Sequence, residues 1–210
     1  LPINMTDNLY GPLHIAHIAE RNNLHFTYIG TGCIFLYDET HPMDSNIGFT
    51  EDDEPNFFGS NYSIVKGYTD RLMKNFRNTL NLRIRMPITN EKHHRNFIYK
   101  ISQFEKVCSV PNSMTVLTEL IPLSFTMMAN GETGTFNFTN PGVITHNEIL
   151  EMYRELVDPD FAWKNMDVEE QNGVLKAKRS NNLLDTSKLE RKYKVDDIKT
   201  AVRKCLESYI

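Results

Sequence analysis

A near-continuous apolar segment at residues 25–35 constrains the fold of this chain most strongly. A strand without polar alternation is typical of a sheet that is covered on both faces, and such sheets are mostly parallel. Helical apolar spacing flanks this segment at residues 8–22 and 60–76, and another strand pattern follows at residues 81–86. Strands that alternate with helices predict an α/β fold, a parallel sheet with flanking helices.

The second half of the chain continues this alternation with shorter elements. Thr145 and Glu148 have the spacing of a capping box and predict a helix start. Residues 37–59 are acidic and polar without periodicity, and a loop of that length is usually functional. We further expect helices at 96–104, 117–129 and 196–209, and a strand at 135–138.

Three polar residues stand where this pattern can support chemistry. Thr31 lies near the end of the first strand, and Tyr62 and Lys66 lie four positions apart in the helix that follows. Side chains at i and i+4 share one helix face, and a nearby ammonium lowers a phenol pKa from its usual value of about 10. We therefore expect Tyr62 to exchange a proton with a carbonyl or alcohol oxygen that Thr31 holds by a hydrogen bond.

The Tyr-x-x-x-Lys spacing is a weak signal when it stands alone. In a chain of this composition and length, the probability that the spacing occurs once by chance is roughly one half. An isolated copy is more often a half-buried Tyr beside a solvated Lys. The ordered context, with an apolar strand and Thr31 upstream, favours a proton-transfer site.

Several further segments match one protein family in the same order along the chain. Over nearly its whole length the chain resembles the bifunctional UDP-4-keto-6-deoxyglucose 3,5-epimerase/4-reductases of UDP-L-rhamnose synthesis. This family belongs to the extended short-chain dehydrogenase/reductases. Bacterial dTDP-4-dehydrorhamnose reductase is similar at a greater distance. The matching segments are GTGCIF at 30–35, the loop at 37–57, 62–66, LRIRMP at 82–87, 95–100, PNSMT at 111–115, 137–142 and RSNN at 179–182.

The resemblance implies a Rossmann-like fold of which the chain holds only a part. No G-x-x-G-x-x-G turn occurs in the sequence, and it begins with Leu1. We therefore expect a C-terminal portion that lacks roughly 70–90 residues of the first nucleotide-binding half. Residues 1–87 would complete the NADP-binding domain with Thr31, Tyr62 and Lys66, and residues 88–210 would mainly form a smaller sugar-nucleotide-binding region.

Cys33 and Lys100 are the acid/base pair for epimerisation that the resemblance implies. Cys33 lies two positions after Thr31, so on a continuous strand both side chains point to one face. A lone Cys is otherwise usually a small buried hydrophobe, and Lys100 would otherwise be a solvated helix residue. The C4 carbonyl of a 4-keto sugar acidifies the hydrogens on C3 and C5, and a thiol and an ammonium can move those protons near neutral pH.

The resemblance also implies residues for cofactor and substrate. NADPH is the expected cofactor, with NADH as an alternative. Its binding residues would be Tyr62, Lys66 and Asn8, of which Asn8 helps to hold Lys66 through a water. Asn8 is equally well explained as a helix cap. Besides Thr31 and Cys33, we expect substrate contacts from Arg85, Asn96 and Arg179. For Arg85 the alternative is a salt bridge, although a guanidinium suits phosphate oxygens well.

Composition narrows the classes of partner. The formal charge of −4 argues against nucleic-acid binding, and no apolar run is long enough for a bilayer. Neither the histidine pairs nor the acidic run at 51–54 has metal-ligand spacing, so we predict no metal. Three cysteines without C-x-x-C favour a reducing compartment, and we expect a cytoplasmic protein. A homodimer is an expectation from the superfamily.

Three functions remain in competition at this point. The leading one epimerises C3 and C5 of UDP-4-keto-6-deoxyglucose and then reduces C4 to give UDP-L-rhamnose. A reductase without epimerase activity, like the dTDP-sugar enzyme, is the first alternative, and Cys33 speaks against it. A non-catalytic regulatory subunit is the second, but it would not need Thr31, Tyr62 and Lys66 together.

Overall fold

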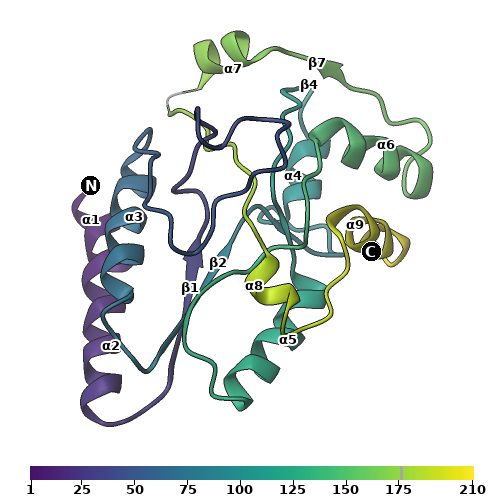
Figure 1. Cartoon of the computed structure of the whole chain (residues 1–210). Helices are drawn as coiled ribbons and strands as arrows, with labels where there is room; N and C mark the ends of the chain where they lie inside the picture. The colour runs from purple at the N-terminus through teal and green to yellow at the C-terminus, as the bar shows by residue number, and fades with distance from the viewer. Residues whose placement is uncertain (176) are drawn as a thin grey trace.

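A parallel sheet forms the centre of the computed structural model, which describes residues 1–175 and 177–210. β1 (Phe26–Thr31), β2 (Thr79–Ile84) and β6 (Gly134–Asn137) lie side by side in that order, all parallel. The successive residues of β2 from Thr79 to Arg83 are all buried, as a sheet covered on both faces requires. The predicted α/β fold with a parallel sheet is confirmed (Figure 1).

Helices cover the sheet on both faces. On one side, α2 (Gly11–Arg21) and α3 (Asn61–Met73) contact β1, after the short helix α1 (Pro2–Met5) and the π-helical turn η1 (Thr6–Tyr10). On the other side, α5 (Leu117–Ala129) and α8 (Ser187–Glu190) pack against the strands. The apolar faces predicted at residues 8–22, 60–76 and 117–129 therefore all form helices.

A buried ion pair attaches α3 to the sheet. The guanidinium of Arg83 on β2 donates to both carboxylate oxygens of Asp70 on α3, at 3.0 and 2.6 Å. Both side chains are buried, and Asn81 Nδ2 donates to the same carboxylate at 2.8 Å. If α3 moved away from β2, the two charges would be separated and at least one would stay buried without a partner, which is energetically costly. The pair therefore holds α3 against the sheet.

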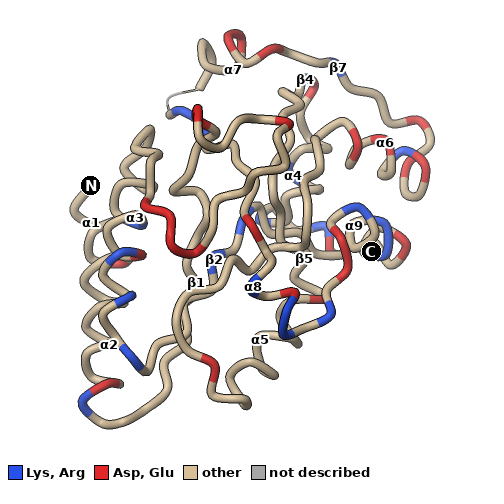
Figure 2. The backbone as a smooth tube through the Cα atoms, in the orientation of Figure 1, with Lys and Arg blue, Asp and Glu red and all other residues tan. Residues whose placement is uncertain are grey.

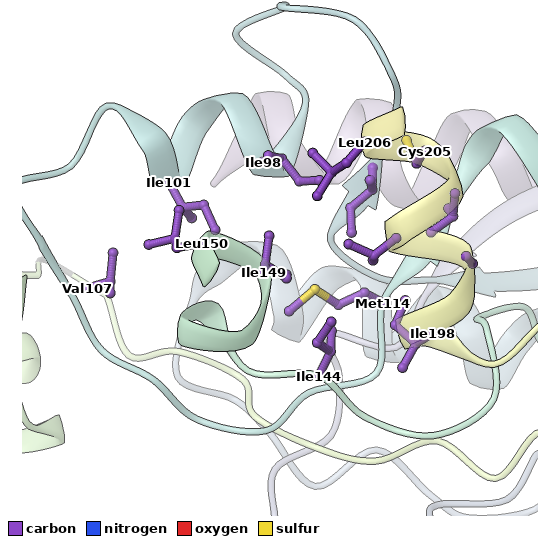
Figure 3. Close-up of a cluster of buried hydrophobic side chains, with 14 residues drawn as sticks. Ile98, Ile101, Val107, Met114, Ile144, Ile149, Leu150, Ile198, Cys205 and Leu206 are labelled. Atoms are coloured by element: carbon purple, nitrogen blue, oxygen red, sulfur yellow. The ribbon is translucent and has the colours of Figure 1, made fainter. Parts of the chain in front are cut away.

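Smaller elements form a second packed region beside the sheet. Its core brings the helices at residues 97–102, 146–156 and 198–207 together through Ile98, Ile149 and Leu206 among others (Figure 3). The capping box of Thr145 and Glu148 at the start of α6 is confirmed. The elements are β3 (Pro87–Ile88), α4 (Phe97–Ser102), β4 (Lys106–Val107), β5 (Thr115–Val116), α6 (His146–Leu156), β7 (Lys164–Asn165), α7 (Val168–Val174) and α9 (Ile198–Glu207).

Two predictions about chain organisation have different outcomes. The strand predicted at 25–35 was too long, because β1 ends at Thr31 and a turn follows. The division at Pro87 stays a prediction, since α5 and β6 come after it yet pack with the sheet. Acidic and basic segments are interspersed along the chain (Figure 2).

Candidate active site

The carboxyl end of β1 carries Thr31 and the turn that holds Cys33. The prediction that Cys33 lies on the strand was wrong. The Cys33 backbone N–H donates to Thr31 Oγ1 at 3.1 Å, and Phe35 N donates to Gly32 O at 3.3 Å, which closes the turn. Asn182 Nδ2 also donates to Gly32 O, at 3.0 Å. The turn therefore presents the Cys33 thiol from a loop rather than from the strand face.

Tyr62 lies in the first turn of α3, opposite this loop. Ser60 caps the helix, since its hydroxyl accepts from Ser63 N at 3.0 Å. Tyr62 is 44% exposed. Partial burial raises the pKa of Tyr62, negative charge at Cys33 adds to this rise, and a hydrogen bond with Thr31 opposes it.

Lys66 lies one turn further along α3 and is buried. Its ammonium donates to the Tyr28 hydroxyl on β1 and to Ile29 O at 3.2 Å, and it lies 4.4 Å from the centre of the Tyr28 ring. Burial lowers the pKa of Lys66 to about 8, although Asp70 and Cys33 oppose the shift. The predicted lowering of the Tyr62 pKa by Lys66 was wrong, because burial raises this pKa and the ammonium is directed to Tyr28.

One large cavity brings most of the predicted residues together. It has a volume of about 870 Å³ and lies between the start of α3, α4 and the segment around residue 179. Cys33, Tyr62, Lys100 and Arg179 all line it. Lys100 and Arg179 are exposed, so both can meet a ligand. Thr31 adjoins this lining, because its hydroxyl accepts from the backbone N–H of Cys33.

Arg85 does not face this cavity, and the expected substrate contact is contradicted. Its side chain is 1% exposed. Nε donates to Ser113 O at 3.2 Å, Nη1 to Gly32 O and Ser180 Oγ, both at 3.0 Å, and Nη2 to Asn112 Oδ1 at 2.6 Å and Ser180 O at 2.9 Å. The guanidinium thus holds three chain segments together behind the cavity wall.

Asn96 is likewise a structural residue, contrary to expectation. It is buried, it caps α4 by accepting from Ile98 N at 3.2 Å, and its amide donates to Thr89 O and Glu91 O. Since both ends of the amide are engaged within the protein, no donor or acceptor faces the cavity from Asn96. Its role is to start the helix that carries Lys100.

Asn8 lies in the π-helical turn η1, next to α3. Its carbonyl accepts from Thr69 Oγ1 at 2.5 Å, and its side chain donates to Asn4 at 2.8 Å. π-helical turns occur frequently at functional sites. The contact joins Asn8 to the helix that carries Lys66, and a direct role for Asn8 in cofactor binding stays a prediction.

Two residues of the site have no distinctive signal in the sequence. Tyr28 sits inside an apolar strand, where an aromatic residue is ordinarily read as core. His146 lines the cavity at the first position of α6, and burial together with the charge of Arg179 lowers its pKa to about 4. A histidine directly after the capping Thr145 could have been noticed, but the spacing alone assigns it no function.

Comparison with known proteins identifies the family. No protein-family model matches the chain. The protein L780 of Acanthamoeba polyphaga mimivirus is 55% identical over 202 residues, which cover 95% of this chain and 70% of L780. Its crystal structure, described as a UDP-rhamnose synthase, superposes with a TM-score of 0.91 at 53% identity, over 96% of this chain and 70% of that one. The chain belongs to the family of this synthase.

Other relatives extend this family and its fold. A bifunctional dTDP-4-dehydrorhamnose 3,5-epimerase/dTDP-4-dehydrorhamnose reductase of Arabidopsis thaliana is 51% identical over 187 residues, 89% of this chain and 62% of the relative. A dTDP-4-dehydrorhamnose reductase of Clostridium acetobutylicum has a TM-score of 0.77 at 18% identity, over 95% of this chain and 71% of that one. This second likeness concerns the fold alone. The chain thus spans about two thirds of the length of these relatives.

Within the part of the chain that the structure describes, each helix is too short or too polar to cross a lipid bilayer.

Proposed function

We propose that this protein epimerises C3 and C5 of UDP-4-keto-6-deoxyglucose and reduces C4 with NADPH to give UDP-L-rhamnose. The observation that carries the proposal is the cavity that Cys33, Tyr62 and Lys100 line together. A thiol, a phenol and an ammonium around one space are the groups that the two reactions need. The family to which the chain belongs supports the same choice of substrate.

For the epimerisation, the protein must remove and return protons next to a carbonyl. Thr31 and Tyr62 would hold the C4 oxygen and stabilise the negative charge that develops on it. Cys33 and Lys100 approach the cavity from a turn and from α4, so they can serve different faces of one sugar ring. One would take the proton from one face, and the other would give a proton of its own to the opposite face.

For the reduction, Tyr62 would give a proton to the C4 oxygen. Its raised pKa keeps the phenol protonated at neutral pH, which suits a proton donor. A nicotinamide cofactor, when bound, supplies the hydride. The residues fit such a group: the Lys66 ammonium has three N–H donors, and the described residues accept from it at Tyr28 and Ile29. The remaining donor would hold a ribose hydroxyl.

The choice of UDP over dTDP and of NADPH over NADH rests on the family resemblance. A cytoplasmic location and a homodimer also remain predictions. Of Arg85, Asn96 and Arg179, Arg179 is the one that lines the cavity, and it stays a candidate for a substrate contact besides Thr31 and Cys33.

The test is a product analysis with the protein made at the full length of its reading frame. We would incubate it with UDP-4-keto-6-deoxyglucose and NADPH in deuterated water and record the product by NMR. A rhamnose product with deuterium at C3 and C5 is expected. A reduced sugar without deuterium would leave a reductase alone, and no turnover despite cofactor binding would favour a regulatory subunit.

A further inference from the structure

His146 lies in the cavity but has no role in the proton transfers described above. It is the first residue of α6, directly after the capping Thr145, and its ring packs edge-on against Phe97 of α4 at 5.2 Å between centroids. Both rings line the cavity. The shared core of α4 and α6, to which Ile98 and Ile149 both belong (Figure 3), holds this wall in place.

The surroundings of the ring fix which nitrogen can bind a ligand. Nδ1 is buried, and no described residue gives it a hydrogen-bond partner. A buried N–H without an acceptor is rarer in proteins than an acceptor without a donor, so Nδ1 is best left unprotonated. The neutral ring then carries its proton on Nε2. His146 therefore offers the cavity an uncharged N–H donor.

The charges around this donor favour an anionic ligand. Arg179 is close enough to disfavour protonation of the ring, and Arg95 and Lys178 line the same cavity. The acidic residue in the lining, Glu105, accepts from Lys164 at 3.2 Å. A neutral donor beside a guanidinium suits phosphate oxygens, which accept several hydrogen bonds at once.

We propose that His146 binds the diphosphate of the nucleotide sugar by donating from Nε2, while Arg179 pairs with its charge. This inference rests on the proposed function, because that function supplies a nucleoside diphosphate as the ligand. It makes the start of α6 the part of the cavity that distinguishes a nucleotide sugar from a free sugar. It also places the sugar between this point and Cys33.

The test compares UDP with uridine as calorimetric probes of the full-length protein. His146→Ala should weaken UDP binding about tenfold, because a charge-assisted hydrogen bond is lost, and should leave uridine binding unchanged. His146→Asn should recover part of the affinity, since its amide also donates. His17→Ala on the outer face of α2 is the control, and it should bind both probes like the native protein.

A second measurement does not depend on the variants binding well. The imidazole signal of His146, assigned by its absence in His146→Asn, should titrate at a higher pH when UDP is bound, because a phosphate stabilises the imidazolium. Uridine should not move it. Two results with His146→Ala would overturn the inference: an equal loss of affinity for UDP and uridine, or an unchanged affinity for UDP. Two results with the native protein would also overturn it: no binding of UDP, or no change in the titration of the His146 signal when UDP is bound.

Failure of this inference can be separated from failure of the proposed function. If the native protein forms the deuterated rhamnose product and the His146→Ala variant binds UDP as tightly as the native protein, the inference alone is overturned. UDP binding that depends on His146, without any sugar product, would overturn the proposed function alone.

Discussion

Replacement of Arg85 by Lys should destabilise the protein strongly, although it keeps the charge. The guanidinium makes five hydrogen bonds within 3.2 Å, to Gly32, Asn112, Ser113 and Ser180. A Lys ammonium is a single point with three donors and cannot reproduce this planar fork. Loss of two bonds to a charged group, at about 1.5–3 kcal/mol each, amounts to about 3–6 kcal/mol of unfolding free energy.

The assay is urea unfolding followed by circular dichroism. With a slope of about 2–3 kcal/mol per molar urea, the midpoint should fall by ~1–3 M. Arg71→Lys is the matched control, because the pair of Arg71 with Glu54 at 2.6 Å is more than half exposed and contributes about 1 kcal/mol at most. An Arg85→Lys midpoint equal to that of the control, together with a tenfold higher KM, would refute the structural role and restore Arg85 as a substrate contact.

Three further predictions concern charge, capping and core. The pKa of Lys66 is about 8 in the folded protein and 10.5 ordinarily, so the unfolded chain binds more protons between these pH values. The free energy of unfolding should therefore rise with pH across this window, and by more in the native protein than in Lys66→Met. Urea midpoints measure this rise, and equal slopes for the two proteins would contradict the effect of burial. Thr145→Ala should remove the cap of α6 and cost about 1 kcal/mol in the same assay, whereas Thr145→Ser should retain most of it. Ile149→Ala empties a fully buried site and should cost about 2–5 kcal/mol, and a loss below 1 kcal/mol would mean that the core is not packed there.

The regular elements were predictable because their signals are local. Periodicity over 117–129 coincides with the bounds of α5, and the capping box marks the start of α6. The end of β1 was not predictable in this way. It depends on Asn182 and Arg85, which bind the carbonyl of Gly32 from distant parts of the chain, and no feature within residues 25–35 reports such contacts.

The site was predictable where spacing alone brings residues together. Tyr62 and Lys66 share α3 because they are one helical turn apart, and Thr31 follows from the strand end. The direction of the Lys66 ammonium toward Tyr28 depends on how α3 packs on β1, which the sequence does not encode locally.

Arg85 and Asn96 show the same limit from the opposite side. A polar residue among apolar neighbours is equally consistent with a ligand contact and with a buried hydrogen-bond network. Only the positions of Ser180 and Asn112 around Arg85, and of Thr89 around Asn96, decide between these roles.

The central claim is that one cavity carries out both epimerisation and reduction and that the two reactions use different residues. The most direct test of this claim is the Cys33→Ala variant of the full-length protein. We would supply it with NADPH in deuterated water and offer either UDP-4-keto-6-deoxyglucose or the already epimerised UDP-4-keto-L-rhamnose. We predict that the variant reduces the epimerised sugar at close to the native rate but places no deuterium at C3 or C5 of the other. Deuterated UDP-L-rhamnose from the unepimerised sugar at the native rate would contradict the assignment of Cys33 and, with it, the account of this site.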